Sequence, residues 1–202
     1  MRSHWFLPES PDVLGTLREQ VRVTMDGMAA FAAWACGESA AESAVREAED
    51  TANDLRRRLS QQLRSAFSTP LDQEDLYTLS ERLGGVLSTA RNVMREAEVL
   101  NLDPDPAVTA LAEIAVEGAG HLAVAMQALD TDNEKATAAA DAAIAAARRM
   151  EEPYRLAMRA GMNHPDLRAL MGRRELYRRT LEVGEREAAV ADRIWYAVLK
   201  DA

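Results

Sequence analysis

Residues 72–100 read DQEDLYTLSERLGGVLSTARNVMREAEVL, and this stretch decides the fold class. Its apolar side chains recur at alternating intervals of three and four residues, at Leu76, Leu79, Leu83, Val86, Ala90, Val93, Ala97 and Leu100. Such spacing places all of them on one side of an α-helix. Asp72 can cap the N-terminus, and the acidic residues after it suit the positive end of a helix. The stretch therefore predicts a long helix that packs lengthwise in a bundle.

Five further stretches carry the same helical spacing. We expect these helices at about residues 11–36, 39–67, 106–130, 132–160 and 166–202. Gly37 should end the first of them, and Pro70 and Pro106 mark the turns on either side of the central helix. Long helices joined by short turns pack antiparallel to their neighbours. The sequence thus predicts an all-α protein of six long antiparallel helices.

Three residues give the expected helices testable detail. The apolar stripe of the first helix includes Met25, and that of the second ends at Phe67. Pro153 lies inside the fifth helix and should kink it, because proline lacks the N–H that the helix needs.

Composition bounds the function. The 202 residues are 48% hydrophobic and 28% charged, which is typical of a globular protein. A net charge of −9 argues against general binding of nucleic acid. We read neither a signal peptide nor a membrane span, and the single cysteine excludes an internal disulfide. We therefore expect a cytoplasmic protein.

Two halves of the chain share short sequence signatures. Glu81-Arg82 in the third helix matches Glu185-Arg186 in the sixth, and 54–57 can be aligned with 152–155. Both matches imply a period of about 100 residues. We therefore predict a single domain, residues 1–202, built of a first repeat at 1–102 and a second at 103–202, each a three-helix bundle.

The turn before the central helix gives a family resemblance. Residues 67–76, FSTPLDQEDL, resemble the Phe-x-Thr-Pro-Ile-Asp-Arg-Glu-Asp-Ile turn of PhoU-like proteins. More closely, the chain resembles the subgroup of accessory, regulatory proteins of PiT-type inorganic phosphate transporters, in its last helix and at Phe6-Leu7-Pro8 as well. The resemblance implies a fold of two three-helix bundles.

PhoU-like proteins bind metal clusters through acidic residues four apart on two helices of each bundle. Residues with this spacing lie on one helix face, so two helices can present four carboxylates to one cation. By this resemblance the first bundle would use Asp50, Asp54 and Glu81, but Gly85 stands where the family has aspartate. We expect no cofactor, with a divalent or iron-type ion at these three residues as the alternative.

The second bundle keeps still less of the acidic pattern. Glu152 and Glu185 remain as its remnant, while Arg148 and Ala189 replace the other two acids. We expect no metal there.

Two arginine clusters offer a different surface. Arginine suits bidentate contact with carboxylate or phosphate, so a face for an anion or a partner could use Arg56, Arg57, Arg173, Arg174 and Arg178. The alternative is a solvated face balanced by neighbouring glutamates. The three histidines, at 4, 121 and 164, match no catalytic spacing, so we predict that the protein is not an enzyme.

These expectations combine into one functional hypothesis. The chain would be a non-enzymatic regulator that docks on the cytoplasmic side of a PiT-type phosphate transporter, a membrane protein. Peripheral association with the inner face of the membrane and a homo-oligomer are compatible with this hypothesis. The alternatives are a PhoU-type signalling adaptor between a phosphate importer and a sensor kinase, and a metal-binding helical bundle.

Overall fold

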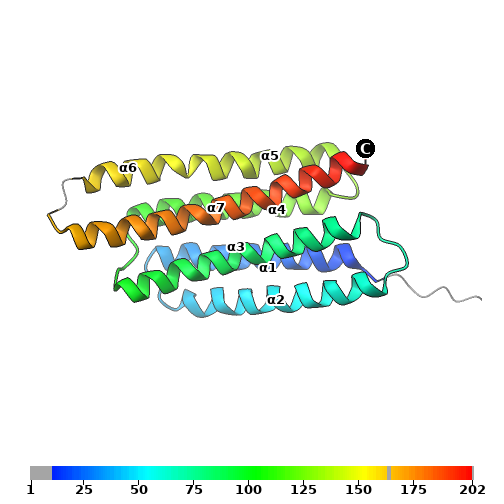
Figure 1. Cartoon of the computed structure of the whole chain (residues 1–202), viewed down its shortest axis with the longest axis horizontal. Helices are drawn as coiled ribbons and strands as arrows, with labels where there is room; N and C mark the ends of the chain where they lie inside the picture. The colour runs from blue at the N-terminus through cyan, green and yellow to red at the C-terminus, as the bar shows by residue number, and fades with distance from the viewer. Residues whose placement is uncertain (1–10, 163–164, 202) are drawn as a thin grey trace, which may run out of the picture.

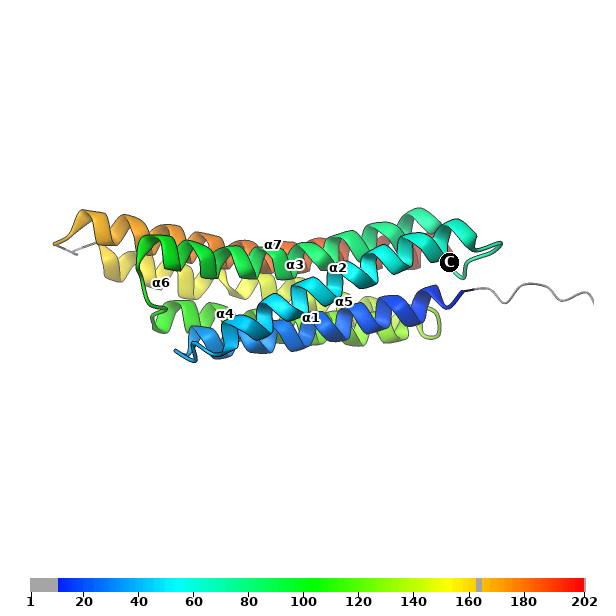
Figure 2. The ribbon, with the colours of Figure 1, turned by 90° about the horizontal axis from the view of Figure 1, so that it is seen from below.

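The computed structural model describes residues 11–162 and 165–201, and within them the only regular secondary structure is helical. The helices run roughly parallel to one long axis (Figures 1 and 2). Their bounds are α1 Val13–Ala35, α2 Ala41–Ser65, α3 Gln73–Leu100, α4 Pro106–Ala128, α5 Asn133–Arg149, α6 Glu151–Gly161 and α7 Leu167–Asp201. The prediction of an all-α bundle is confirmed. Phe6-Leu7-Pro8, His4 and His164 lie outside the described residues.

The helices form two groups that pack side by side. In the first half, α1, α2 and α3 contact one another, and in the second half α4, α5 and α7 do the same. The halves meet where α1 contacts α4 and where α3 contacts α7. The turns after α1, α3 and α6 lie at one end of the bundle, which we call the α6–α7 end, and the C-terminus lies at the opposite end (Figure 1).

Aspartates begin most of these helices. Asp72 accepts a 2.8 Å hydrogen bond from the backbone N–H of Glu74, as predicted for the central helix. The same kind of cap precedes α1, α4 and α5, formed by Asp12, Asp105 and Asp132. Each cap satisfies N–H groups that have no partner within the helix. Gly37 follows the end of α1 with a φ of 96°, a left-handed conformation that glycine adopts without strain.

The fifth predicted helix is interrupted rather than continuous. It divides at Met150 into α5 and α6, three residues before Pro153. Because proline has no N–H and its ring collides with the carbonyl four residues earlier, the regular ladder cannot pass Arg149. The backbone N–H of Met150 instead bonds to the carbonyl of Ala147, one residue closer than in an α-helix. The predicted kink is therefore a break between two coaxial helices.

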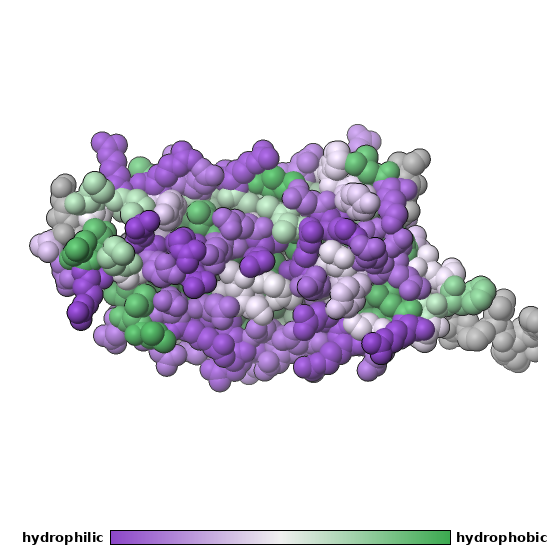
Figure 3. Space-filling model, in the orientation of Figure 1, coloured by the Kyte–Doolittle hydropathy of each residue, from purple (hydrophilic) through white to green (hydrophobic). Residues whose placement is uncertain are grey.

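Two predicted core positions are wrong. Met25 is exposed, and the buried stripe of α1 passes through Gln20 and Thr24 instead. Thr24 bonds to the carbonyl of Gln20, and the Gln20 amide exchanges two hydrogen bonds with Ser80 of α3, so these polar groups are satisfied inside the core. Phe67 lies beyond the end of α2 and is 98% exposed. Polar side chains cover most of the helix surface seen in Figure 3.

α4 is long and apolar enough to cross a membrane by length and composition alone. In this fold it is a central helix of the bundle, because it contacts α1, α5 and α7. Its buried residues include Leu111, Leu122 and Met126, which are fully enclosed. Packing between neighbouring helices thus accounts for its apolar composition.

Candidate functional site

The acidic residues predicted to bind metal in the first half do not form a metal-binding cluster. Asp50 and Asp54 on α2 and Glu81 on α3 are all exposed. The Asp54 carboxylate lies 2.6 Å from the guanidinium of Arg57 on the same helix. Across residues 11–162 and 165–201, no group of three or more His, Cys, Asp and Glu side chains could hold a metal ion. Metal binding at these three residues stays a prediction without geometric support.

A different glutamate, Glu49, makes the contacts between α2 and α3 near the predicted acids. Glu49 on α2 accepts a 2.7 Å hydrogen bond from the Ser88 hydroxyl and forms an ion pair with Arg91, both on α3. Burial opposes ionisation of Glu49, but the bonds from Arg91 and Ser88 outweigh it and hold its pKa below the ordinary value of 4.5. No sequence pattern indicated this role, because the partners of Glu49 lie about 40 residues away on another helix.

Replacing Glu49 with glutamine is expected to destabilise the protein at pH 7 by about 1.5–3 kcal/mol. Because the folded-state pKa is lowered, the ionised group contributes stability above its ordinary pKa, and this contribution is lost as the pH falls through the folded-state value. Urea unfolding at several pH values should show the variant and the natural protein converging in acid. Asp50→Asn, an exposed neighbour, is the control and should change little; equal effects would contradict the assignment.

The positions where the family motif has aspartate now accommodate arginines from the opposite half. Two contacts join α3 and α7 here. In the first, the Arg82 guanidinium donates a hydrogen bond to the backbone carbonyl of Ala189. In return, the Cδ of Arg186 lies 4.0 Å from where a Cβ on Gly85 would be. Gly85 and Ala189 are small enough to leave room for these arginine side chains. Where the family motif has acids, this chain therefore has a packed contact between its two halves, which we call the seam.

This seam also bears on the predicted repeat. Arg82 and Arg186 occupy matching positions of the two signatures, as do Gly85 and Ala189, and each arginine reaches the small residue of the other half. Reciprocal contacts of this kind are what a two-fold relation between two similar units produces. The duplication itself stays a prediction.

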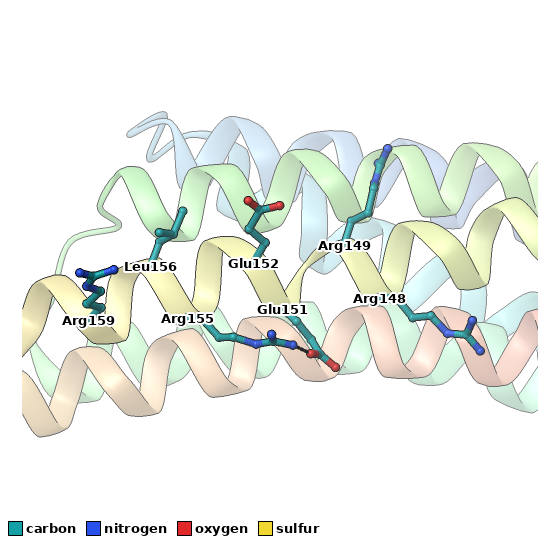
Figure 4. A pocket seen from close by; sticks show the side chains of 7 residues that line it. All are labelled: Arg148, Arg149, Glu151, Glu152, Arg155, Leu156 and Arg159. Atoms are coloured by element: carbon teal, nitrogen blue, oxygen red, sulfur yellow. Dashed lines mark hydrogen bonds and ion pairs between the residues drawn. The ribbon is translucent and has the colours of Figure 1, made fainter.

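The remnant acids of the second half are separated. Glu152 lies on α6, on the side that faces α4, beside Arg149 (Figure 4). Glu185 on α7 lines a different hollow together with Arg148 and Glu151. The structure therefore does not join Glu152 and Glu185 into one site.

A groove runs along α6 in the second half of the chain. Its lining is mostly charged and consists of Arg148, Arg149, Glu151, Glu152, Arg155, Leu156 and Arg159. We call this the α6 groove; its volume is about 590 Å³ (Figure 4). None of the residues of α6 is fully buried, and Tyr154, Ala157 and Met158 are the half-buried side chains by which it packs against the core.

Charge within the α6 groove is only partly neutralised. Arg155 pairs with Glu151, and Arg149 pairs with Glu117 of α4. Arg148 and Arg159 have no ion pair with any carboxylate in the described part of the chain. The groove can therefore bind carboxylate or phosphate groups through free guanidinium groups. The sequence predicted arginines near this region but not the groove that they line.

The arginine face predicted from sequence is split between two places. Arg56 and Arg57 lie on α2, which has no contact with α7 in the described structure. Arg173 lies 2.8 Å from Asp105, and Arg178 pairs with Glu175 and Glu182. Arg174 on α7 is exposed. The five arginines therefore do not share one surface, and their role in binding stays a prediction.

Comparison with known proteins identifies the fold. No protein-family model matches the sequence, and no curated protein sequence matches it. Among solved structures, a PhoU-like protein from Shewanella oneidensis MR-1 is similar with a TM-score of 0.78 and 12% identity, over 93% of this chain and 99% of that one. A putative PhoU-like phosphate regulatory protein from the same organism gives a TM-score of 0.80 and 12% identity, over 94% and 100%.

These likenesses define the class of fold. The chain has the PhoU-like fold along nearly its whole length, as the Thr-Pro turn and the six-helix pattern predicted. At 12% identity the comparison speaks for the fold, so the narrower resemblance to accessory proteins of PiT-type transporters stays a prediction.

Proposed function

We propose that the protein is a non-enzymatic regulator of inorganic phosphate transport that docks on the cytoplasmic side of a PiT-type transporter. The observation that carries this proposal is the PhoU-like fold over 94% of the chain, shared with a solved protein described as a putative phosphate regulatory protein. The Thr-Pro turn at residues 67–76 supports the narrower choice of transporter, because it resembles that of the accessory subgroup.

The α6 groove is the proposed contact for the transporter. Its free cations, Arg148 and Arg159, suit the carboxylates of an acidic cytoplasmic loop. Leu156 adds apolar surface beside them and is 60% exposed. A groove of arginine, glutamate and leucine recognises charge and shape, whereas a hydrolytic site needs a nucleophile paired with a base.

Affinity capture tests the proposal directly. The double variant Arg148→Glu and Arg159→Glu is expected to lose most of its binding to the detergent-solubilised transporter, because two attractive contacts become repulsive. The matched control, Arg58→Glu with Arg64→Glu at exposed sites on α2, makes the same change of charge and should bind normally. A strain without the gene should show altered phosphate uptake that the natural protein restores and the groove variant does not.

The same experiment separates the proposed function from its alternative. Capture of a sensor kinase and an ABC-type importer, with no retention of the PiT-type transporter, would replace the accessory role with that of a signalling adaptor. Unchanged uptake together with no association would contradict the proposal.

A further inference from the structure

Charge is unevenly distributed along this chain. Residues 148–179 contain nine arginines and four acidic residues, in a protein whose net charge is −9. This stretch includes α6 and the first turns of α7, which lie at the α6–α7 end of the bundle together with the turns after α1 and α3 (Figure 1). These two segments are therefore cationic while the rest of the chain is strongly anionic, so the molecule should orient itself near a charged surface.

Large apolar side chains are exposed at the same end. Met162, Leu167 and Met171 are 75%, 69% and 53% exposed. Arg168 and Arg174 are exposed beside them, and we call these five residues the end patch. Figure 3 shows apolar and polar side chains interleaved where α6 meets α7.

The sequence of α7 places three of these residues on one outward face of the helix. Leu167, Met171 and Arg174 follow intervals of four and three, so they lie in a row along the helix. The opposite face of the same turns is anchored: Leu176 and Tyr177 are buried in the bundle. The first turns of α7 thus have an apolar inner face, which packs in the bundle, and an exposed outer face that carries both apolar and basic side chains.

Contacts behind the end patch hold it in place. Arg173 and the Tyr177 hydroxyl both bond to Asp105, the residue that caps α4, at 2.8 and 2.5 Å. A Cβ at Gly172 would lie 2.9 Å from Leu102, so the turn after α3 packs closely against this helix. The apolar side chains are therefore displayed by a supported helix, and their exposure does not result from a frayed end.

We propose that the end patch docks the protein on the surface of an anionic lipid bilayer. Leucine and methionine can enter the boundary between headgroups and acyl chains, while the neighbouring arginines bind lipid phosphates. The strongly anionic remainder of the chain is repelled by the same surface, which leaves the α6–α7 end facing the bilayer. An acidic protein loop would satisfy the arginines but would not require three exposed aliphatic side chains at the tip.

Co-sedimentation of the full chain with vesicles tests this proposal. The protein should bind vesicles of phosphatidylcholine with phosphatidylglycerol, release as salt is raised, and bind phosphatidylcholine vesicles at least about tenfold more weakly. Arg168→Glu with Arg174→Glu should lower binding to the anionic vesicles at least about tenfold. Leu167→Ser with Met171→Ser should lower it to a similar extent. All four sites are exposed, so circular dichroism and urea unfolding should show unchanged folding.

The control variant is Arg58→Glu with Arg64→Glu on α2, which carries the same charge change at two exposed sites away from the end patch and should bind as the natural protein does. Equal binding to neutral and anionic vesicles, no binding to either, or equal loss in the control would overturn the proposal. The vesicle test and the transporter test are independent of each other. If the protein does not bind vesicles but is captured by the solubilised transporter, only the proposed lipid contact is refuted.

Discussion

Replacing Arg193 with methionine is expected to lower the free energy of unfolding by about 3–5 kcal/mol. Arg193 on α7 lies 2.5 Å from the carboxylate of Asp75, whose side chain is only 2% exposed at the start of α3. The Lys200 ammonium also pairs with the Asp75 carboxylate, at 3.5 Å, and it pairs with Asp72 as well. Removing the guanidinium leaves a buried carboxylate nearly uncompensated, which costs far more than losing an exposed pair.

Urea unfolding at pH 7 measures this loss, and a second variant separates its causes. Arg193→Met with Asp75→Asn removes the buried charge as well, so it should recover part of the lost stability. Arg57→Met is the control, because its pair with Asp54 is exposed and should contribute about 0–1 kcal/mol. A loss at Arg193 no larger than this control would show that the pair does not stabilise the fold.

This cluster gives the Thr-Pro turn a structural role. The turn carries Asp72 and Asp75, and both acids are tied to the last helix, more than 100 residues later in the chain. Bonding to Lys200 also lowers the pKa of Asp72, while the pKa of Lys200 is raised in return. The motif that carries the family resemblance therefore joins the two halves at the end opposite the end patch (Figure 1).

Local signals accounted for most of the fold. The three-four spacing of α3 predicted its buried face, and Asp72, Gly37 and Pro106 predicted where helices begin or end. These signals act within a few residues, so one sequence suffices to read them. The prediction for Met25 was wrong because the buried position is the neighbouring Thr24, whose hydroxyl bonds to a backbone carbonyl of the same helix. Periodicity alone treats any polar residue as a surface residue.

The candidate sites were much less predictable, because their partners are distant in sequence. Nothing near Asp75 or Glu49 distinguishes these acids from the exposed acids beside them, and their arginines lie on other helices. The helix divides at Met150, although Pro153 predicted only a kink. Arg82 and Arg186 were noticed as a repeated signature, while their contact across the two halves depends on packing.

Glu187 is a buried acid for which the sequence analysis made no prediction. Its side chain is fully buried on α7, and neither carboxylate oxygen has a hydrogen-bond partner in the described structure. It lies against α4 at Gly118, where an added Cβ would come within 2.3 Å of a carboxylate oxygen. Burial raises the pKa of Glu187 well above its ordinary value of 4.5. Between pH 4.5 and this raised pKa, the folded protein therefore binds a proton that the unfolded chain releases.

Replacing Glu187 with leucine or glutamine is accordingly expected to stabilise the protein, and increasingly so as the pH rises. A raised folded-state pKa means that the group costs no ionisation energy below pH 4.5. Above that value the natural protein loses about 1.4 kcal/mol of stability per pH unit relative to either variant, until the folded-state pKa is reached. Leucine should stabilise more than glutamine, because it leaves no unpaired polar group in the core.

Unfolding by urea across a pH series, read as the difference between each variant and the natural protein, isolates this one group, since every other carboxylate is common to both. Glu185→Gln supplies the control: it is exposed on the same helix, two residues earlier, and should give a flat difference. A flat difference for Glu187 too would mean that its carboxylate finds water or a cation in solution. A rising one would show that the second half keeps a neutral acid in its core at the expense of stability, which is the pattern expected of a residue retained for function.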